Sequence, residues 1–565
     1  MKTATCLLVC LLCISAHSQT IPFNFFAATS TAPATDWPLN TLCGFNGYVC
    51  PVISGGTQTA VGSLGHPVTL EWGWVEGCKA ASNDDTDPCY TWTALDAAVS
   101  AAQSHNVPIA ITLGYTPNWA VNSIYNNSTY CPKNGLSGET LCTVPPDDVD
   151  NSGGSVYWKN FVQALLAHYG PSSTFASMKK YYETWNEPSG SNFWYLAKCS
   201  ATSPCTFVDQ ANPSGVSVTD YGTSRLATMG RILYMASKAS GTNSGHGWTI
   251  ADPNATILAP SATGPVLGGS GNIRPMKTWL DAYLAAANVW GTSFYCTSTS
   301  GLPKTSPVCA DGVVFHGYLD ASGQRPWPEG RYVDTGNNWY GPTSQQVSEV
   351  RASIHTYDST DAIPLFDTEG GWGKTDLQNN GANSCASGDF SCDTAWLARW
   401  YVIQAGLYAP TSASGEGLHI ASWYDWGDEV GNANGWGIIK QTNGDPTPAG
   451  VAYGWVTKWL TNNTVSPAAP ATYPSANFWQ ANIGYGGNSA AAKIAWYCGD
   501  TGAPPACVWT PGTTGSWTVN TSNYDHYQDL GGTIHTIVNP LSVTMVPIIL
   551  FKGATPPWCA AGGCL

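Results

Sequence analysis

The segment Tyr181-Tyr-Glu-Thr-Trp-Asn-Glu-Pro188 begins with a short run that is typical of a buried β-strand and ends with a carboxylate at Glu187. A second segment, Pro364-Leu-Phe-Asp-Thr-Glu-Gly-Gly-Trp-Gly373, has the same character and carries Glu369. The ends of parallel strands in one sheet lie on the same edge. If both segments belong to such a sheet, the two carboxylates can act on one substrate bond.

From residue 21 to about residue 460, short apolar runs alternate with amphipathic stretches, as in βα units on a parallel sheet. The predicted strands are 21–27, 68–74, 107–113, 180–185, 256–260, 312–316, 364–368 and 419–424. The predicted helices are 93–105, 156–169, 221–240, 276–289, 344–357, 394–408 and 449–460. This pattern predicts an α/β fold, a (β/α)8 TIM barrel over residues 19–461, with its active site at the carboxyl ends of the strands. An open doubly wound sheet is the alternative, but no Gly-rich phosphate loop follows the first strand.

The character of the chain changes after residue 461. Residues 462–474 are rich in Pro, Ala and Ser, and the following short alternating runs lack helical periodicity. These runs are 478–483, 491–497, 507–510, 516–519, 533–538 and 543–551. We predict that residues 462–565 form a linker and an all-β sandwich accessory domain. Such a domain either helps to bind carbohydrate or packs against the side of the barrel.

The composition indicates a loop-rich secreted protein. Only 10% of the 565 residues are charged, whereas there are 60 Gly, 38 Pro and 26 Trp. Residues 1–18 have a basic start and an apolar run shorter than the roughly 20 residues of a membrane span, so we predict a signal peptide cleaved before Gln19. We therefore expect an extracellular protein without a membrane anchor. With a net charge of −15 and 22 basic residues, nucleic acid is an unexpected partner, and the oligomeric state stays open.

The cysteines point to disulfides rather than to a metal site. Three of the 19 lie in the predicted signal peptide, which leaves 16, an even number suited to an oxidising compartment. They fall into the neighbouring pairs Cys43/Cys50, Cys78/Cys89, Cys131/Cys142, Cys199/Cys205, Cys296/Cys309, Cys385/Cys392, Cys498/Cys507 and Cys559/Cys564. Sequence alone does not fix this connectivity. No C-x-x-C spacing near a His indicates zinc, and we expect neither metal nor cofactor. The glycosylation sequons begin at Asn126, Asn127, Asn254, Asn462 and Asn520.

Two carboxyl groups at the mouth of a barrel are the requirement for glycosidic bond hydrolysis. One protonates the leaving oxygen, and the other attacks the sugar or activates water. Glu187 follows the fourth strand and Glu369 the seventh, and we expect the retaining separation of about 5 to 5.5 Å. Two more acidic residues share these strands. We expect Asp367 to lie deeper and to be structural, and Glu183 to be an interior partner of a polar or basic group.

Several motifs together carry a resemblance to a known family. They are Trp185-Asn-Glu-Pro188, the strand-seven Glu369, Gly114-Tyr-Thr-Pro-Asn-Trp-Ala120, Trp72-Gly-Trp-Val-Glu76 and Tyr90-Thr-Trp-Thr-Ala-Leu-Asp96. With these the chain resembles the retaining glycoside hydrolases of clan A, and most of all glycoside hydrolase family 39 and its relatives. The resemblance covers the barrel from strand one to strand eight, and the β-sandwich is similar as well. It implies that Glu187 is the general acid/base and Glu369 the nucleophile.

The resemblance also implies four substrate-binding side chains, Asn186, His316, Tyr318 and Trp423, and Trp119 and Trp74 are further candidates to line sugar subsites. Asn186 would hydrogen-bond the sugar 2-hydroxyl, and Trp423 would lie under the sugar as an aromatic floor. His316 and Tyr318 would touch the nucleophile or the sugar. A structural role remains open for these two, and simple packing remains open for the tryptophans.

These observations lead to one main hypothesis. The chain is expected to be a secreted retaining glycoside hydrolase that cleaves O-glycosidic bonds of a plant or microbial polysaccharide or oligosaccharide by double displacement. The alternatives are a transglycosylase that uses the same carboxylates and an inert carbohydrate-binding wall protein. Long loops closed by cysteine pairs surround the strand ends, so the sugar, the linkage and the endo or exo mode stay open.

Overall fold

The computed structural model describes residues 24–27, 63–64, 68–104, 109–134, 140–149, 155–190, 192–198, 205–206, 217–218, 222–238, 252, 255–264, 276–292, 296, 306–318, 328–329, 332–333, 339–340, 343–360, 362–371, 390–407, 418–423, 448–460, 463–485, 488–499, 507 and 509–559. The predicted signal peptide, residues 1–18, lies outside this part of the chain. In the described residues no helix combines the length and the apolar character needed to cross a bilayer.

All eight predicted parallel strands are present. They are β1 (Asn24–Ala27), β3 (Val68–Glu71), β4 (Ile109–Gly114), β8 (Lys180–Glu183), β11 (Thr256–Leu258), β12 (Val313–His316), β15 (Leu365–Gly370) and β16 (Leu418–Trp423). The side chains of β8, β12 and β15 are buried throughout, as expected for strands of a parallel sheet covered on both faces.

The strands pair in the order of a barrel. β3, β4, β8 and β11 form one parallel group, and β12, β15, β16 and β1 form a second, with the short β2 (Ser63–Leu64) beside β1. Parallel bridges from Leu258 to Gly312 and from Ala262 to Phe315 join the two groups. The last strand therefore lies next to the first, which a doubly wound sheet does not require. Among the described residues no pairing joins β1 or β2 to β3, so barrel closure stays a prediction.

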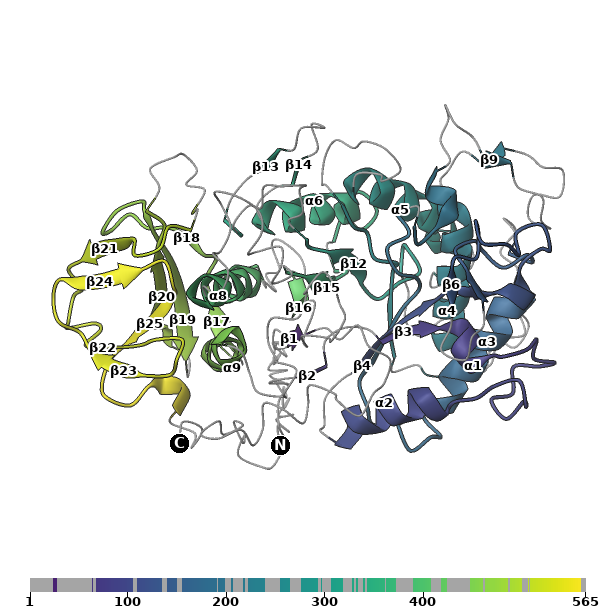
Figure 1. The fold of residues 1–565 in the computed structure, drawn as a ribbon, viewed down its shortest axis with the longest axis horizontal. Coiled ribbons are helices and arrows are strands. Elements are labelled where there is room, and N and C mark those ends of the chain that lie inside the picture. Colours follow the sequence, from purple (N-terminus) through teal and green to yellow (C-terminus); the bar gives the residue numbers. More distant parts are fainter. Residues whose placement is uncertain are drawn as a thin grey trace, which may run out of the picture.

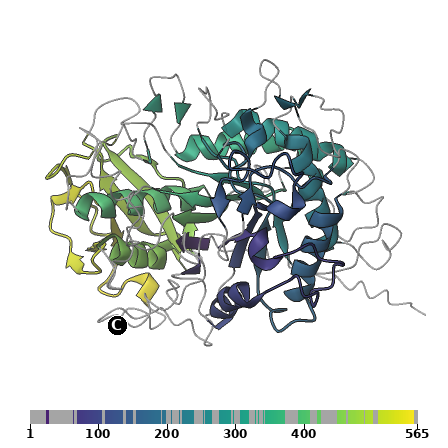
Figure 2. The same cartoon turned by 45° about the vertical axis from the view of Figure 1, so that its right-hand side comes forward.

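Helices surround these strands (Figure 1 and Figure 2). The predicted helices appear as α2 (Thr93–Ser104), α3 (Val156–His168), α4 (Thr223–Lys238), α5 (Met276–Thr292), α6 (Thr343–His355), α8 (Phe390–Gly406) and α9 (Pro448–Leu460). Each helix from α3 onward contacts the next one along the chain. The shorter elements are β5 (Thr116–Pro117), β6 (Lys133–Asn134), β7 (Thr140–Cys142), β9 (Cys205–Thr206), β10 (Ser217–Val218), β13 (Tyr332–Val333), β14 (Trp339–Tyr340), η2 (Asn118–Ala120), η3 (Tyr195–Lys198) and η7 (Pro557–Cys559).

The second parallel strand is shorter than predicted. β3 ends at Glu71, and Trp72–Val75, which we expected to continue the strand, form the single helical turn α1. The indole Nε1 of Trp72 donates to the Glu76 carboxylate at 2.5 Å, and the Glu76 N–H donates to the Trp72 carbonyl at 3.0 Å. Contacts between residues four apart close a helical turn. An apolar run alone does not reveal them.

The C-terminal part consists of antiparallel strands. A seven-stranded sheet contains β17 (Thr464–Val465), β18 (Ala469–Pro470), β19 (Phe478–Tyr485), β20 (Asn488–Tyr497), β22 (His526–Gln528), β23 (Ile534–Thr536) and β25 (Ile548–Phe551), and a separate pair contains β21 (Thr514–Trp517) and β24 (Leu541–Thr544). An apolar cluster that includes Phe478, Trp517 and Leu550 joins the two sheets. A β-sandwich needs this kind of packing. The sandwich and the domain boundary at residue 462 stay predictions.

Helices α8 and α9 lie between these sheets and the parallel strands (Figure 1). The buried guanidinium of Arg399 on α8 donates from Nε to the Met545 carbonyl at 3.0 Å and from Nη1 to the Cys507 carbonyl at 3.3 Å. Its Nε also lies 3.8 Å from a carboxylate oxygen of the buried Glu329. The C-terminal sheets are thus tied to a barrel helix by a fully buried cation.

Four of the predicted cysteine pairs are disulfides, which confirms the neighbouring connectivity for them: Cys78–Cys89, Cys131–Cys142, Cys296–Cys309 and Cys498–Cys507. Cys392 is disulfide-bonded as well. Each of the other four predicted pairs includes at least one residue outside the described part of the chain. Because each of the four observed bridges joins residues 9 to 13 positions apart, they hold individual loops in shape rather than linking distant elements.

Candidate active site

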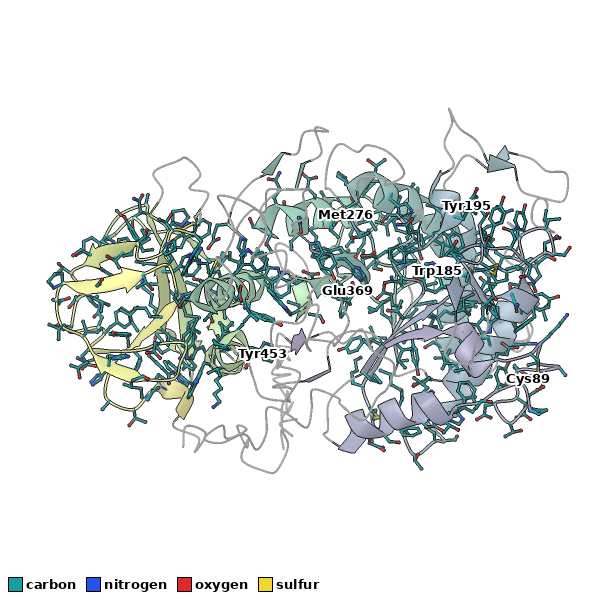
Figure 3. All side chains as sticks on the ribbon, viewed as in Figure 1. Cys89, Trp185, Tyr195, Met276, Glu369 and Tyr453 are labelled. Carbon is teal, nitrogen blue, oxygen red and sulfur yellow. A yellow bond between two sulfur atoms is a disulfide. The ribbon has the colours of Figure 1, made fainter. Side chains whose placement is uncertain are left out.

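The parallel sheet brings three polar side chains together at one edge. Glu187 follows the end of β8 by four residues, and Glu369 lies near the end of β15. His316 is the last residue of β12 and is paired in register with Glu369. Because β11 and β12 are the only strands between β8 and β15 in the sheet order, the ends of β8 and β15 are close in space. Glu369 appears near the middle of the molecule in Figure 3.

His316 bridges the two glutamates. Its Nδ1 lies 2.8 Å from Glu187 Oε1 and 3.4 Å from Glu369 Oε2. One oxygen of each carboxylate and a ring nitrogen of His316 all lie within 4.8 Å of one another. The hydroxyl of Tyr318 donates to Glu369 Oε2 at 3.0 Å. Four side chains that we predicted as site residues are therefore in one cluster, and His316 touches both carboxylates rather than the nucleophile alone.

The pKa of His316 is raised, so its imidazole is protonated up to alkaline pH. Burial alone would lower the pKa of His316, but the negative charges of Glu369, Glu187 and Glu183, together with the hydrogen bond to Glu187, raise it to about 9. The His316 ring is fully buried, and its Nε2 has no hydrogen-bond partner among the described residues. The imidazole of His316 is therefore protonated at neutral pH, and its Nδ1 lies 2.8 Å from Glu187 Oε1.

Glu183 is the last residue of β8, four residues before Glu187, and both of its carboxylate oxygens accept hydrogen bonds. Its Oε1 accepts from the Ser261 N–H at 3.0 Å. Its Oε2 accepts from the hydroxyls of Thr112 at 3.2 Å and Thr368 at 3.4 Å. The side chain is buried. These contacts are those of an interior partner of polar groups, as we expected for Glu183.

Asp367 lies two residues before Glu369 and is equally enclosed. Its Oδ1 accepts from the Gly317 N–H at 2.9 Å, and its Oδ2 accepts from the Gln404 side-chain amide on α8. A Cβ on Gly317 would lie 2.3 Å from Asp367 Oδ2, so only glycine fits between His316 and Tyr318. Burial raises the pKa of Asp367 to about 8, although the hydrogen bond from Gly317 and the charge of His316 oppose the rise.

The other predicted site residues differ in their surroundings. Asn186 is partly buried, and its Oδ1 is a buried atom that has no hydrogen-bond partner among the described residues. Trp423 is fully buried, with its ring edge-on to Trp396 and Trp400 at centroid distances of 5.4 and 5.5 Å. Because the ring has no exposed face in this structure, its role as a sugar platform stays a prediction.

The two remaining predicted tryptophans, Trp119 in η2 and Trp74 in α1, have less support as substrate-binding residues. Trp119 packs edge-on against Trp72 at 5.7 Å and Tyr157 at 5.8 Å, and its Nε1 donates to the Glu76 carbonyl. Its observed contacts are thus with an aromatic cluster rather than with Glu187 or Glu369. The side chain of Trp74 lies outside the described residues. Sugar binding by either residue stays a prediction.

Sequence reasoning missed three residues that hold the site together, Ser261, Gly317 and Gln404. Ser261 and Gly317 directly follow the predicted strands 256–260 and 312–316, and that position is the only signal that could have singled them out. Gln404 lies in the last turn of α8, where nothing in the pattern distinguishes it from other buried helix residues. These roles depend on contacts between residues 37 to 78 positions apart in the chain.

The same cluster has the ligand types of a metal site. Glu187, His316 and Glu369 each offer one ligand atom at spacings that could hold a cation. A second group in the described residues, Glu329 with Cys498 and Cys507, is not available as such, because the two cysteines form a disulfide. The expected absence of a metal stays a prediction.

No family model matches the chain, and no curated protein sequence matches it either. Among solved structures, the chain is similar to a family 39 glycoside hydrolase from the gut symbiont Bacteroides cellulosilyticus WH2, with a TM-score of 0.53 and 13% identity over 94% of this chain and 82% of that chain. It is also similar to a monomeric β-xylosidase from Caulobacter crescentus CB15, with a TM-score of 0.42 and 14% identity over 82% and 85% of the two chains. A glucosidase from Croceicoccus marinus has a TM-score of 0.41 and 12% identity over 83% of each chain. The first of these comparisons shows that the chain has the fold of a family 39 glycoside hydrolase, which confirms at the level of fold the resemblance that the motifs indicate.

Proposed function

We propose that this protein is a retaining glycoside hydrolase in which Glu187 is the general acid/base and Glu369 the nucleophile. The observation that carries the proposal is the convergence of both carboxylates on His316, with one oxygen of each within 4.8 Å. Retaining enzymes hold their carboxyl groups about 5 to 5.5 Å apart, whereas inverting enzymes need about 6.5 to 9.5 Å to admit a water molecule. The spacing of these oxygens, 4.8 Å or less, supports the shorter separation.

In the first step, Glu369 attacks the anomeric carbon while Glu187 protonates the departing glycosidic oxygen. A nucleophilic carboxylate must be ionised, and the Tyr318 hydroxyl, which donates to Glu369 Oε2 at 3.0 Å, favours its anion. The His316 imidazolium, whose Nδ1 lies 2.8 Å from Glu187 Oε1, is the proposed source of the proton that Glu187 passes to the leaving oxygen. The bond from the anomeric carbon to the leaving oxygen breaks as the ester bond to Glu369 forms, and the leaving group departs as a neutral alcohol.

In the second step, Glu187 accepts a proton from water, which attacks the anomeric carbon and releases Glu369. The ester has neutralised Glu369, so His316 loses one of the three negative charges that raise its pKa. Tyr318 then donates to the departing carboxylate again. Asn186, whose Oδ1 has no partner in the described part of the chain, would accept a hydrogen bond from the sugar 2-hydroxyl and thereby hold the ring against Glu187.

We further propose that the enzyme is secreted and acts on a plant or microbial polysaccharide or its oligosaccharides. The short apolar N-terminal run, the disulfides and the exposed sequon residues Asn126, Asn127 and Asn520 support an extracellular protein. Carbohydrate is then the only expected partner. Trp423, Trp119 and Trp74 remain candidate stacking surfaces for sugar rings.

The proposal is tested by screening aryl glycosides and polysaccharides and following the anomeric products by NMR. We expect at least one glycoside to be cleaved with retention at the anomeric carbon, and we expect turnover to be unchanged after treatment with a chelator. Inversion would contradict the assigned roles. Loss of turnover on chelation, restored by a divalent cation, would instead assign Glu187, His316 and Glu369 to a metal site.

A further inference from the structure

The backbone of Glu187 is in an unusual conformation. Its φ of 43° lies in the left-handed region, which residues other than glycine rarely adopt. Pro188 follows, and a residue before proline is normally extended. Of the other two non-glycine residues with positive φ in the described part of the chain, Cys309 and Cys507, each is held by a disulfide. Glu187 has no covalent tie of this kind, so other contacts must hold its turn.

Those contacts come from Ser261, three residues beyond the end of β11. The Ser261 hydroxyl accepts a hydrogen bond from the Glu187 N–H at 2.9 Å. The same hydroxyl lies 3.5 Å from the Trp185 carbonyl, to which it can donate. Ser261 thus contacts the chain on both sides of Asn186, at the two points between which the backbone turns.

Ser261 is itself fixed in place. It is fully buried, and its N–H donates to Glu183 Oε1 at 3.0 Å. The buried Glu183 is anchored in turn by the hydroxyls of Thr112 and Thr368. A continuous chain of hydrogen bonds therefore runs from the barrel interior through Glu183 and Ser261 to the backbone of Glu187.

Resting on the proposed function, we propose that Ser261 is a positioning residue for the acid/base, because its hydroxyl holds the left-handed turn that aims the Glu187 carboxyl at the leaving oxygen. Ser261 makes no observed contact with the Glu187 carboxylate and does not take part in proton transfer. Without the hydroxyl, the Glu187 N–H loses its acceptor and the turn can relax toward an extended conformation. A displacement of about 1 Å at a reacting group can cost on the order of 100-fold in rate.

This role has a signature that a merely structural residue lacks. An acid that protonates the leaving oxygen matters most when the leaving group is a poor one. The variant Ser261→Ala should therefore retain kcat/KM within about 3-fold on an aryl glycoside with a strongly acidic phenol. On a glycoside of an alcohol or a weakly acidic phenol, it should lose about 10- to 100-fold.

The matched control is Ser237→Ala. Ser237 is also a fully buried serine with one hydrogen bond to a main-chain carbonyl, that of Asp252 at 2.7 Å, but it lies on α4. Its replacement should lower Tm in a similar way and leave the dependence on the leaving group as in the wild type. Ser261→Thr, which keeps the hydroxyl, should restore the wild-type dependence. If Ser261→Ala does not fold, Ser261→Cys keeps the size of the side chain, provides only a weak acceptor and serves in the same comparison.

The possible results separate this inference from the proposed function. If the wild type cleaves glycosides and Glu187→Ala shows a steep dependence on the leaving group, the proposed function stands. In that case, if Ser261→Ala loses activity equally on all leaving groups, or loses none, only the positioning role is overturned. If the wild type cleaves no glycoside, both fall together.

Discussion

An inner and an outer carboxylate lie at each of two strand ends, Glu183 and Glu187 at β8 and Asp367 and Glu369 at β15, and the two layers differ in what surrounds them. The inner residues, Glu183 and Asp367, are fully buried, and both oxygens of each accept hydrogen bonds from the protein. The side chains of the outer residues, Glu187 and Glu369, are 13% and 9% exposed and share a single imidazole. Identical chemical groups a few residues apart thus have different surroundings. Saturation and access, rather than residue type, distinguish a structural carboxylate from a reactive one.

On β15 we expect the largest difference in activity between a variant of the outer carboxylate and a variant of the inner one. Glu369→Ala removes the proposed nucleophile and should reduce kcat/KM by at least about 10⁴-fold. Asp367→Asn is the control. The Gln404 amide can turn so that its Oε1 accepts from the new side chain, and we expect more than about a tenth of the activity to remain. The measurement is the steady-state rate of each variant on one aryl glycoside. Similar losses in both variants would contradict the proposed difference between the inner and outer carboxylates.

On β8 the expected loss is smaller, because general acid catalysis contributes about 10²- to 10⁴-fold. Glu187→Ala should lose this factor on glycosides with poor leaving groups, and azide should restore turnover on an activated aryl glycoside by attacking the glycosyl-enzyme. The product to detect is the glycosyl azide. Glu183→Gln supplies the comparison, because azide should not accelerate it. Azide rescue of the Glu183 variant, without rescue of the Glu187 variant, would exchange the two assignments.

The shared imidazole predicts a change in the pH profile. His316→Asn removes the group whose pKa is raised to about 9 and leaves the acid function to the Glu187 carboxyl alone. The alkaline limb of the kcat/KM profile should then move to lower pH by at least about one unit, with about a 10- to 100-fold loss at neutral pH. An unchanged alkaline limb in a folded variant would show that His316 does not share the catalytic proton.

For the inner carboxylates we predict a smaller effect, which concerns the pH dependence of the protein's stability. The pKa of Asp367 is raised to about 8 in the folded state from its ordinary value of 3.8. The folded protein therefore binds more protons than the unfolded chain between these values, and its free energy of unfolding falls as the pH rises through this range. The raised pKa values of Glu76, about 7, and His316, about 9, act in the same direction. Tm should decrease from about pH 5 to pH 9, and Asp367→Asn should flatten the decrease below pH 8. A Tm that rises over this range would contradict the protonated state of the inner carboxyl.

How far the sequence predicts this arrangement depends on the range of the contacts involved. The eight strands and the positions of Glu187 and Glu369 follow from local apolar runs and short motifs. The helical turn at Trp72–Val75 does not, because the Glu76 carboxylate that closes it lies beyond the run. The contacts of Ser261, Gly317 and Gln404 are with residues far away in the sequence, and a periodic sequence pattern does not indicate such contacts. The burial of Trp423 was likewise unexpected, because Trp396 and Trp400, which cover it, belong to a separate helix.

The most direct test of the account is to identify the residue that becomes covalently attached to the sugar. A 2-deoxy-2-fluoro aryl glycoside of the accepted sugar slows the second step, so the glycosyl-enzyme accumulates and can be mapped by peptide mass spectrometry. We predict a single adduct on Glu369. An adduct on Asp367, two residues away in the inner layer, would contradict the central claim that the less buried, imidazole-linked carboxylates are the reactive ones.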